Sequence, residues 1–290
     1  MKVIEQIEAL RKELDRARKA GQKIGLVPTM GYLHEGHLSL IDIARQKSDV
    51  VVMSLFVNPT QFGPNEDLNN YPRDFASDER LARERGTDII FYPAVEEMYP
   101  SKQYTYVITE ELSGILCGAY RSTHFRGVTT VVAKLFNIIQ PDLAVFGQKD
   151  HQQAILLRKM VADLNFPIEI IMARIVREPS GLAMSSRNVY LNPAERRQAP
   201  VIYAALQKAR IAVQKGETNA MKIKALIREE IARSSLAEIQ YVEVVNNCDL
   251  ASMTTIEPGT FAAVAVYYGR TRLIDNIYLM DEKPRGLDPV

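Results

Sequence analysis

The sequence predicts an α/β protein with a doubly wound (Rossmann-like) parallel sheet, followed by a second, smaller α+β domain. In the first half, short apolar runs alternate with helical stretches, which is the order that a parallel sheet covered by helices produces. After about Arg177 the order changes, and two helical stretches are followed by three strand-like runs. We place the boundary near Val176, beside the turn-forming residues 178–181, and expect domains at 1–176 and 177–290.

The first domain is expected to open with a helix over residues 1–21, because Val3, Ile7, Leu10 and Leu14 fall on one helical face. A nearly continuous apolar run at 50–57 is typical of a parallel strand covered on both faces. Strands are also expected at 24–27, 88–92 and 143–146, and helices at 38–47, 74–85, 128–139 and 152–164. In such a sheet, ligands bind beyond the carboxyl ends of the strands.

The second domain is expected to begin with two amphipathic helices. Apolar residues at helical spacing predict helices over 194–215 and 221–233. Strand-like runs follow at 239–245, 261–268 and 273–279.

Composition excludes several classes of protein. The net charge is only +1, so the chain offers no broad basic surface for non-specific binding of nucleic acid. No apolar run approaches the roughly 20 residues that span a bilayer, and residues 1–21 lack the apolar core of a secretory signal. Cys117 and Cys248 lie far apart and form no CxxC pair, so neither a disulfide framework nor a structural zinc site is indicated. We expect a protein of the reducing cytoplasm, with no nucleic-acid or membrane partner.

The most informative segment is VPTMGYLHEGH, at 27–37, which leaves the first strand and places His34 and His37 at the entry to a helix. A helix N-terminus presents unpaired N–H groups and a positive dipole, and it is a natural binding site for phosphate. Two imidazoles three residues apart add hydrogen-bond donors, and Gly36 between them permits close approach of the backbone. This context favours a nucleotide site.

The same segment has three competing interpretations. A zinc-protease motif needs histidines four residues apart on one helical face, so the spacing of His34 and His37 is wrong for it. A dinucleotide or Walker-type site needs GxGxxG or GxxxxGK[ST], and neither pattern is present in this segment. For an arbitrary HxxH, a structural pair in a turn is the ordinary interpretation, and the residues alone leave it open.

Two further segments carry groups suited to phosphate. Gly147-Gln148-Lys149-Asp150 directly follows the strand at 143–146, which places a lysine at a carboxyl end; in isolation, Lys149 and Asp150 would be a solvated charge cluster. Met184-Ser185-Ser186-Arg187 combines two hydroxyls with a guanidinium, which suits phosphate oxygens, although such loops are common.

Together these segments resemble the adenylyl-transferring branch of the nucleotidylyltransferase superfamily. In that branch an HxGH motif and a KMSKS-like loop clamp ATP from opposite sides; here residues 184–187 would be that loop, with Ala183 in place of its first lysine. Four long segments resemble one member, the pantoate–β-alanine ligase (pantothenate synthetase) family, over essentially the whole chain. They read VPTMGYLHEGHLSLI, VNPTQFGPNEDLNNYPRD, HFRGVTTVVAKLFNIIQPDLAVFGQKDHQQ and GLAMSSRNVYL.

The resemblance implies a ligase that activates pantoate with ATP and Mg²⁺ as pantoyl adenylate, and then transfers the pantoyl group to β-alanine. It implies catalytic roles for His37, His34, Lys149 and Arg187. The ATP-binding residues that it implies are Met30, Gly31, Tyr32, Leu33, His34, Glu35, Gly36, His37, Gly147, Gln148, Lys149, Asp150, Val176, Met184, Ser185, Ser186 and Arg187. Gln61 and Gln153 would bind pantoate, with Gln61 near β-alanine, and Asn58 and Tyr71 would shape that pocket or serve the turn. A homodimer is implied as well.

The chain departs from the family pattern at two places. Where the family has GEKD followed by an aromatic residue, this chain has Gln148 in place of the glutamate and His151 in place of the aromatic residue. Where the family has RPGHFRG, this chain has Ser122 and Thr123 in place of the proline and the glycine. Because Lys149, Asp150 and Gln153 are kept, these changes bear on positioning more than on the reaction. Another small-molecule adenylyl- or cytidylyltransferase, or a nucleotide sensor without catalysis, remains the alternative; a tRNA synthetase would need a tRNA-binding extension that this short chain does not offer.

Overall fold

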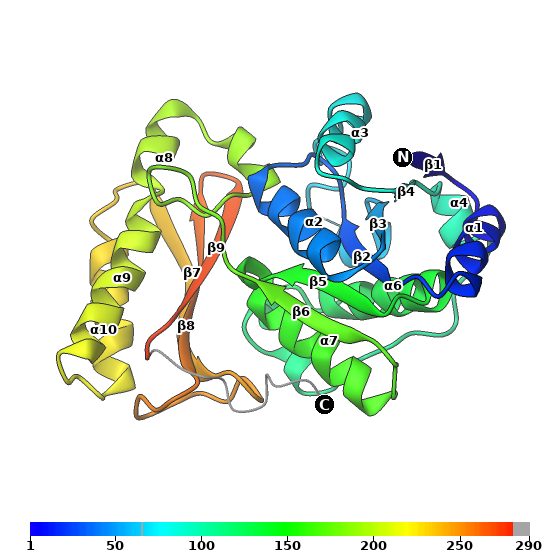
Figure 1. The fold of residues 1–290 in the computed structure, drawn as a ribbon. Helices are drawn as coiled ribbons and strands as arrows, with labels where there is room; N and C mark the ends of the chain where they lie inside the picture. The colour runs from blue at the N-terminus through cyan, green and yellow to red at the C-terminus, as the bar shows by residue number, and fades with distance from the viewer. Residues whose placement is uncertain (65, 281–290) are drawn as a thin grey trace. The chain divides into compact units, whose positions relative to one another are not determined.

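The computed structural model describes residues 1–64 and 66–280, which form two compact units (Figure 1). The first unit comprises Met1–Gly114, Gly118–Gln148 and Leu156–Arg174. The second comprises Ile115–Cys117, Lys149–Ile155 and the described residues from 175 to 280. Two short segments of the second unit therefore precede the boundary expected near Val176, and the division into 1–176 and 177–290 stays a prediction.

The first unit is built on a parallel sheet of six strands in the order β1-β4-β3-β2-β5-β6. This is the doubly wound sheet that the sequence predicts. The strands are β1 (Lys2–Ile4), β2 (Ile24–Thr29), β3 (Val50–Leu55), β4 (Ile89–Phe91), β5 (Leu143–Gly147) and β6 (Glu169–Ala173).

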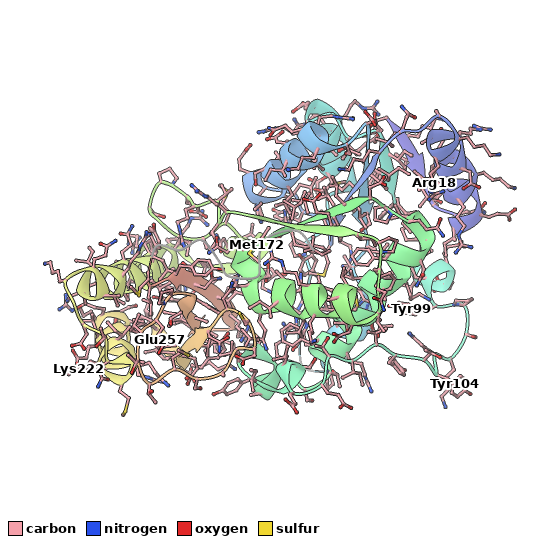
Figure 2. The ribbon with its side chains drawn as sticks, turned by 60° about the horizontal axis from the view of Figure 1, so that its bottom comes forward. Arg18, Tyr99, Tyr104, Met172, Lys222 and Glu257 are labelled. Carbon is pink, nitrogen blue, oxygen red and sulfur yellow. The ribbon has the colours of Figure 1, made fainter. Side chains whose placement is uncertain are left out.

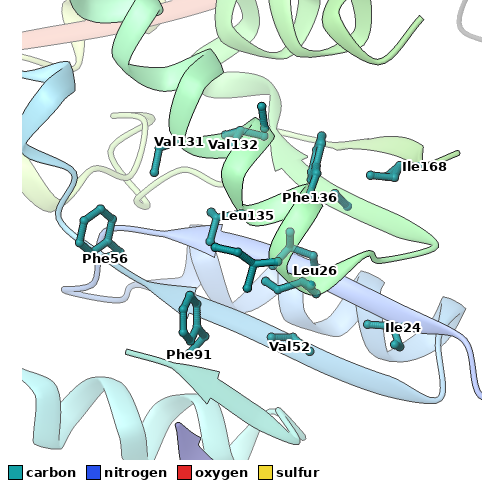
Figure 3. Packing of buried hydrophobic residues seen from close by; sticks show 14 of the residues in the cluster. Ile24, Leu26, Val52, Phe56, Phe91, Val131, Val132, Leu135, Phe136 and Ile168 are labelled. Atoms are coloured by element: carbon teal, nitrogen blue, oxygen red, sulfur yellow. The ribbon is translucent and has the colours of Figure 1, made fainter. Parts of the chain in front are cut away.

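Alternation along the strands divides the apolar residues between two cores. Leu26, Val52 and Phe91 face the helix α6 (His124–Ile139), whose residues Leu135 and Phe136 pack over them (Figure 3). On each of these strands, the residues that alternate with them face the opposite side of the sheet, where they pack with α2 (Glu35–Lys47). The other helical segments of this unit are α1 (Ile7–Lys19), η1 (Pro59–Gln61), α3 (Phe75–Glu84), α4 (Val95–Met98), η2 (Leu112–Gly114) and most of α7 (His151–Asp163).

The order of the strands places a topological switch point between β2 and β5. From β2 the chain proceeds through β3 to β4 on one side, and it then returns to β5 and β6 on the other side. The carboxyl ends of β3, β2 and β5 lie next to one another at one edge of the sheet. Ligands of open α/β sheets bind at such an edge.

The second unit has an antiparallel sheet in the order β7-β8-β9. The strands are β7 (Ala237–Asn246), β8 (Thr260–Tyr268) and β9 (Thr271–Tyr278). One face of the sheet packs with α9 (Val201–Gln214) and α10 (Ala220–Ile231), and the short helix α8 (Pro193–Gln198) precedes them. The short segments α5 (Cys117–Tyr120) and η3 (Gln148–Asp150) each include residues of both units, and η4 (Ser186–Tyr190) precedes α8.

Three differences from the sequence-based expectations have a local reason. Residues 2–4 form β1, not the start of a helix, because they pair with β4. The helix expected over 194–215 is divided into α8 and α9 at Pro200, which has no N–H to donate within a helix. The strand β6, which had not been expected, pairs with β5 along Leu143–Gly147.

Candidate active site

The imidazoles of His34 and His37 cap the N-terminus of α2. Nδ1 of His34 accepts a hydrogen bond from the N–H of Gly36 at 3.1 Å, and Nδ1 of His37 accepts one from the N–H of His34 at 3.4 Å. This reciprocal pattern is a capping box made by two histidines. In a neutral ring whose Nδ1 accepts, the proton lies on Nε2, so we assign Nε2–H as the donor of each ring.

The loop between β2 and α2 is held by a carboxylate from α3. Asp78 accepts hydrogen bonds from the backbone N–H groups of Tyr32 at 2.8 Å and Leu33 at 2.7 Å. Gly31 and Tyr32 both have positive φ, and a Cβ on Gly31 would lie 2.9 Å from an oxygen of Asp78. Burial raises the pKa of Asp78 above its ordinary value, although the two N–H groups oppose the rise. Asp78 thus fixes the turn that delivers His34.

The carboxylate of Glu35 is engaged by a neighbouring helix end. Arg85, which follows α3, donates to both oxygens of Glu35 at 3.0 and 2.8 Å and to Asp42 at 2.7 Å. The Asp42 carboxylate, and then Glu35, raise the pKa of Arg85 further. The predicted contact of Glu35 with ATP would therefore use its backbone N–H at the helix start.

Gln61, predicted to bind pantoate, contacts the predicted ATP segment. Its side-chain amide nitrogen donates to Sδ of Met30 at 3.1 Å, and its oxygen accepts from Nδ2 of Asn58 at 3.1 Å. Asn58, itself 1% exposed, accepts a 2.8 Å bond from the hydroxyl of Tyr99, which is labelled in Figure 2. Burial raises the pKa of Tyr99. Because Nδ2 of Asn58 can only donate, the Gln61 atom that it contacts is assigned as the amide oxygen, and the atom that contacts Met30 is the amide nitrogen.

Close packing of α6 holds the η1 turn that carries Gln61. Asn58 donates to the carbonyl of Gly127 at 3.2 Å. A Cβ on Gly127 would lie 2.4 Å from the carbonyl oxygen of Thr60 and 2.6 Å from Cα of Gln61. The ring of His124 adds a 2.9 Å hydrogen bond to the carbonyl of Gln61. Only glycine at 127 allows this approach.

The segment that departs from the family pattern before α6 is anchored by an ion pair. Arg121 binds both oxygens of Glu66, at 2.7 and 2.5 Å. Burial alone would raise the pKa of Glu66, but the guanidinium holds it below its ordinary value. Tyr71 is buried and packs edge-on against Phe62 with ring centroids 5.9 Å apart, so it has a structural contact in this loop.

The predicted phosphate-binding segment at the end of β5 is shared between the two units. Gly147 ends β5 and Gln148 begins η3 in the first unit, whereas Lys149 and Asp150 belong to the second. Nζ of Lys149 lies 3.6 Å from a carboxylate oxygen of Asp150. The Lys149 carbonyl accepts a 3.1 Å bond from Nδ2 of Asn276 in β9.

His151, which stands where the family pattern has an aromatic residue, is itself a buried aromatic ring. It packs edge-on against Phe261 and Tyr278, with centroids 4.4 and 5.4 Å away. Its Nε2 lies 2.7 Å from Oδ1 of Asn247. The histidine therefore fills the place of an aromatic residue and adds a hydrogen bond. Gln153, two residues further along α7, is half-buried.

A hairpin carries the predicted KMSKS-like loop. The N–H of Met184 donates to the carbonyl of Val176 at 3.0 Å, and Arg177 pairs with Ala183 in an antiparallel bridge. Gly181 turns the hairpin with a φ of 92°. Thus Val176 and Met184, both predicted to bind ATP, lie next to each other.

Beyond the hairpin, the loop is capped by its own side chains. Oγ of Ser185 accepts the N–H of Arg187 at 3.3 Å, and Ser186 is 6% exposed. Nδ2 of Asn188 donates to the carbonyl of Ala183 at 3.1 Å and to Glu178 at 2.9 Å. These bonds fix the backbone from which Arg187 projects.

Several residues of the site were not found from the sequence. Asp78, Tyr99 and Asn276 act on loops that lie 41 or more residues away in the chain, and no local motif marks them. Within residues 1–64 and 66–280, no group of three or more His, Cys, Asp or Glu side chains is arranged to hold a metal ion. In the same residues, no helix has the length and hydropathy needed to cross a membrane.

Comparison with known proteins gives one consistent result. Residues 2–278 match the family model described as pantoate-beta-alanine ligase. A pantothenate synthetase of Acetivibrio thermocellus is 53% identical over 277 residues, which cover 96% of this chain and 99% of that protein.

Solved structures agree. The pantothenate synthetase of Thermus thermophilus superposes with a TM-score of 0.93 at 42% identity, covering 97% of this chain and 100% of that one. A pantoate-beta-alanine ligase from Francisella tularensis, complexed with beta-gamma ATP and beta-alanine, gives a TM-score of 0.81 at 34% identity over 97% of this chain and 99% of that one. The chain belongs to the pantoate–β-alanine ligase family.

Proposed function

We propose that the chain condenses pantoate with β-alanine through a pantoyl adenylate, with the site residues named above in the roles that the family resemblance implies. The observation that carries the assignment is the contact between Gln61, predicted to bind pantoate, and Met30 in the predicted ATP segment. Adenylation requires that the acid and the nucleotide be held against each other, so that the reacting atoms are aligned. The complex of the Francisella enzyme with beta-gamma ATP and beta-alanine supports the choice of substrates.

In the first step, a carboxylate oxygen of pantoate attacks the α-phosphorus of ATP, and the bond to pyrophosphate breaks. The carboxylate is already ionised at neutral pH, so the step needs no general base. It needs in-line placement and cationic or hydrogen-bonding groups for the charge that develops on pyrophosphate. His34 and His37 would supply Nε2–H donors, and Lys149 and Arg187 would supply positive charge.

In the second step, the neutral amine of β-alanine attacks the carbonyl carbon of the mixed anhydride, and AMP leaves with the bonding electrons. The amine proton is lost as the amide forms. Gln61 would contact the pantoyl group in both steps, since its amide is oriented by Asn58 on one side and Met30 on the other. An amide, which both donates and accepts, suits the hydroxyls and carboxylate of pantoate.

Mg²⁺ would enter with ATP as part of the substrate complex. This fits the described residues, which hold no cluster of three or more candidate ligands. Mg²⁺ is commonly bound through substrate phosphates and few protein carboxylates. The family resemblance also supports a homodimer, a cytoplasmic location, and a division in which residues 1–176 bind ATP and pantoate and residues 177–290 carry the loop.

The experiment that tests the proposal is a product balance with purified full-length protein, ATP, Mg²⁺, pantoate and β-alanine. We expect one pantothenate, one AMP and one pyrophosphate for each ATP consumed. Formation of ADP, or nucleotide turnover that ignores β-alanine and pantoate, would contradict the proposal. An adenylyltransferase with a different acceptor would release pyrophosphate only with that acceptor, and a sensor would release none.

A further inference from the structure

Two adjacent residues of β9 each hold one of the predicted phosphate-binding segments of the second unit. Asp275 and Asn276 are both 4% exposed, and neither had been singled out from the sequence. Because side chains alternate along a strand, they project from opposite faces of β9. Each makes its contact with a different segment.

On one face, Asp275 binds the hairpin that carries the Met184–Arg187 loop. Its two oxygens accept from Nη1 and Nη2 of Arg177 at 2.6 and 2.9 Å. Arg177 also donates to the carbonyl of Gly181 at 3.2 Å and stacks over Tyr203 at 3.6 Å. A bidentate ion pair on a buried carboxylate, with these additional contacts, has a defined geometry, and it fixes the hairpin to the strand.

On the other face, Asn276 binds the Lys149 segment. Its Nδ2 donates to the carbonyl of Lys149 at 3.1 Å, and Tyr278 on the same face lies 3.3 Å from Nε2 of His151. The backbone links the two faces directly, because the N–H of Asn276 donates to Oδ1 of Asp275 at 2.8 Å. One dipeptide, whose two side chains are buried, therefore connects both segments through hydrogen bonds.

We propose that Asp275 and Asn276 are positioning residues that set the Lys149 segment and the Arg177–Met184 hairpin relative to each other for attack on ATP. The inference rests on the proposed function, in which Lys149 and Arg187 stabilise the leaving pyrophosphate. The contacts described for Asp275 and Asn276 are to protein groups. Both residues act by fixing the backbone from which the two cationic side chains project, and small misplacements of such groups are costly to catalysis.

The test separates the two half-reactions in Asn276→Ala. The first half-reaction is pantoate-dependent exchange of pyrophosphate into ATP, which needs both phosphate-binding segments. The second is conversion of chemically prepared pantoyl adenylate and β-alanine to pantothenate, which involves no pyrophosphate. We expect kcat/KM for exchange to fall about 10- to 100-fold, while the second half-reaction stays within a factor of about three of wild type.

The matched control is Asn219→Ala at the N-terminus of α10 in the same unit. Asn219 also binds backbone through its side chain, accepting the N–H groups of Met221 at 2.9 Å and Lys222 at 3.1 Å. The control removes an equivalent side chain away from the two segments, so it should lower the melting temperature without separating the half-reactions. Arg177→Lys is the second test variant: it keeps the charge opposite Asp275 but cannot form the paired contact, and we expect the same selective loss of exchange.

Wild-type exchange without pantoate, or no exchange, would reject the proposed function itself. If wild-type exchange is normal but Asn276→Ala loses both half-reactions equally, or loses neither, the positioning role is rejected and the proposed function stands. If Asn276→Ala does not fold, Arg177→Lys decides by the same comparison: selective loss of exchange supports the role, and any other pattern rejects it.

Discussion

The ring centroids of His34 and His37 lie 4.1 Å apart, and Nδ1 of His37 accepts the backbone N–H of His34. The two histidines are thus a structural pair, as the simplest interpretation of an HxxH turn holds. In the two capping hydrogen bonds, each histidine accepts through Nδ1. Because the cap fixes the ring orientation and the position of the proton, it also prepares Nε2–H as a donor, and the structural and catalytic interpretations are compatible.

The Nε2–H donor of His37 can be tested apart from the cap. In His37→Asn the side-chain oxygen can replace the capping Nδ1, but no donor replaces Nε2–H. In His37→Gln the side-chain oxygen can accept the N–H of His34, as glutamine does at this position of an ordinary capping box, and the amide nitrogen can donate in place of Nε2–H. We expect His37→Asn to stay as stable as wild type and to lose about 10²- to 10³-fold in pantoate-dependent exchange. We expect His37→Gln to stay about as stable as wild type and to retain more activity than His37→Asn. The reverse order of activities would contradict the assignment of Nε2 as the catalytic donor.

Asp78→Asn should loosen the loop before α2. An asparagine oxygen can accept only one of the bonds from Tyr32 and Leu33 in the present geometry, and its NH₂ group would face the other N–H. We expect a loss of about 1–3 kcal/mol in the free energy of unfolding, with reduced affinity for ATP. Unchanged urea unfolding and an unchanged KM for ATP would show that the carboxylate does not hold this loop.

The same variant gives a pH dependence with a defined sign. Burial raises the pKa of Asp78 in the folded protein above the ordinary value of 3.8. The stability that this group contributes is therefore fully present below the unfolded pKa, and it is lost as pH rises through the folded pKa. Wild type should gain stability relative to Asp78→Asn as pH is lowered from neutral toward that ordinary value. A difference that narrows on acidification would contradict the direction of the shift.

Gly127→Ala should displace the turn that carries Gln61. The new Cβ would meet backbone atoms of Thr60 and Gln61 at 2.4 to 2.6 Å, which flexible side chains cannot relieve. We expect a loss of about 1–3 kcal/mol in stability and a raised KM for pantoate, with KM for ATP less affected. Gly114→Ala is the control, because no atom lies within 4 Å of the Cβ that alanine would add there. Equal kinetics in the two variants would exclude a role for α6 in placing Gln61.

Much of the fold follows from local patterns. The buried runs of β2, β3 and β5 are predictable because strands covered on both faces are almost entirely apolar. The edge strand β1 has only three residues, so its formation depends on β4, which lies far along the chain. The helix α6 was expected to begin after Gly127, yet it begins at His124, so Gly127 lies inside the helix. Glycine is present there because α6 packs so closely against η1 that no Cβ fits.

In the candidate site as well, some residues can be predicted from local sequence and others cannot. Motifs contiguous in the sequence, such as 30–37 and 184–187, are visible without a structure. The groups that orient them are not, because Asp78, Tyr99 and Asn276 reach their partners only through the tertiary fold. Ordinary residue types in ordinary helices and strands give no sign of such roles.

Adenylation of pantoate by this chain can be measured by isotope exchange. Wild-type protein is incubated with ATP, Mg²⁺ and radiolabelled pyrophosphate, without β-alanine, and label in ATP is measured with and without pantoate. Because formation of pantoyl adenylate is reversible and needs no amine, we predict rapid labelling of ATP that depends entirely on pantoate. Labelling that is absent with pantoate, or equal without it, would show that the chain does not adenylate pantoate.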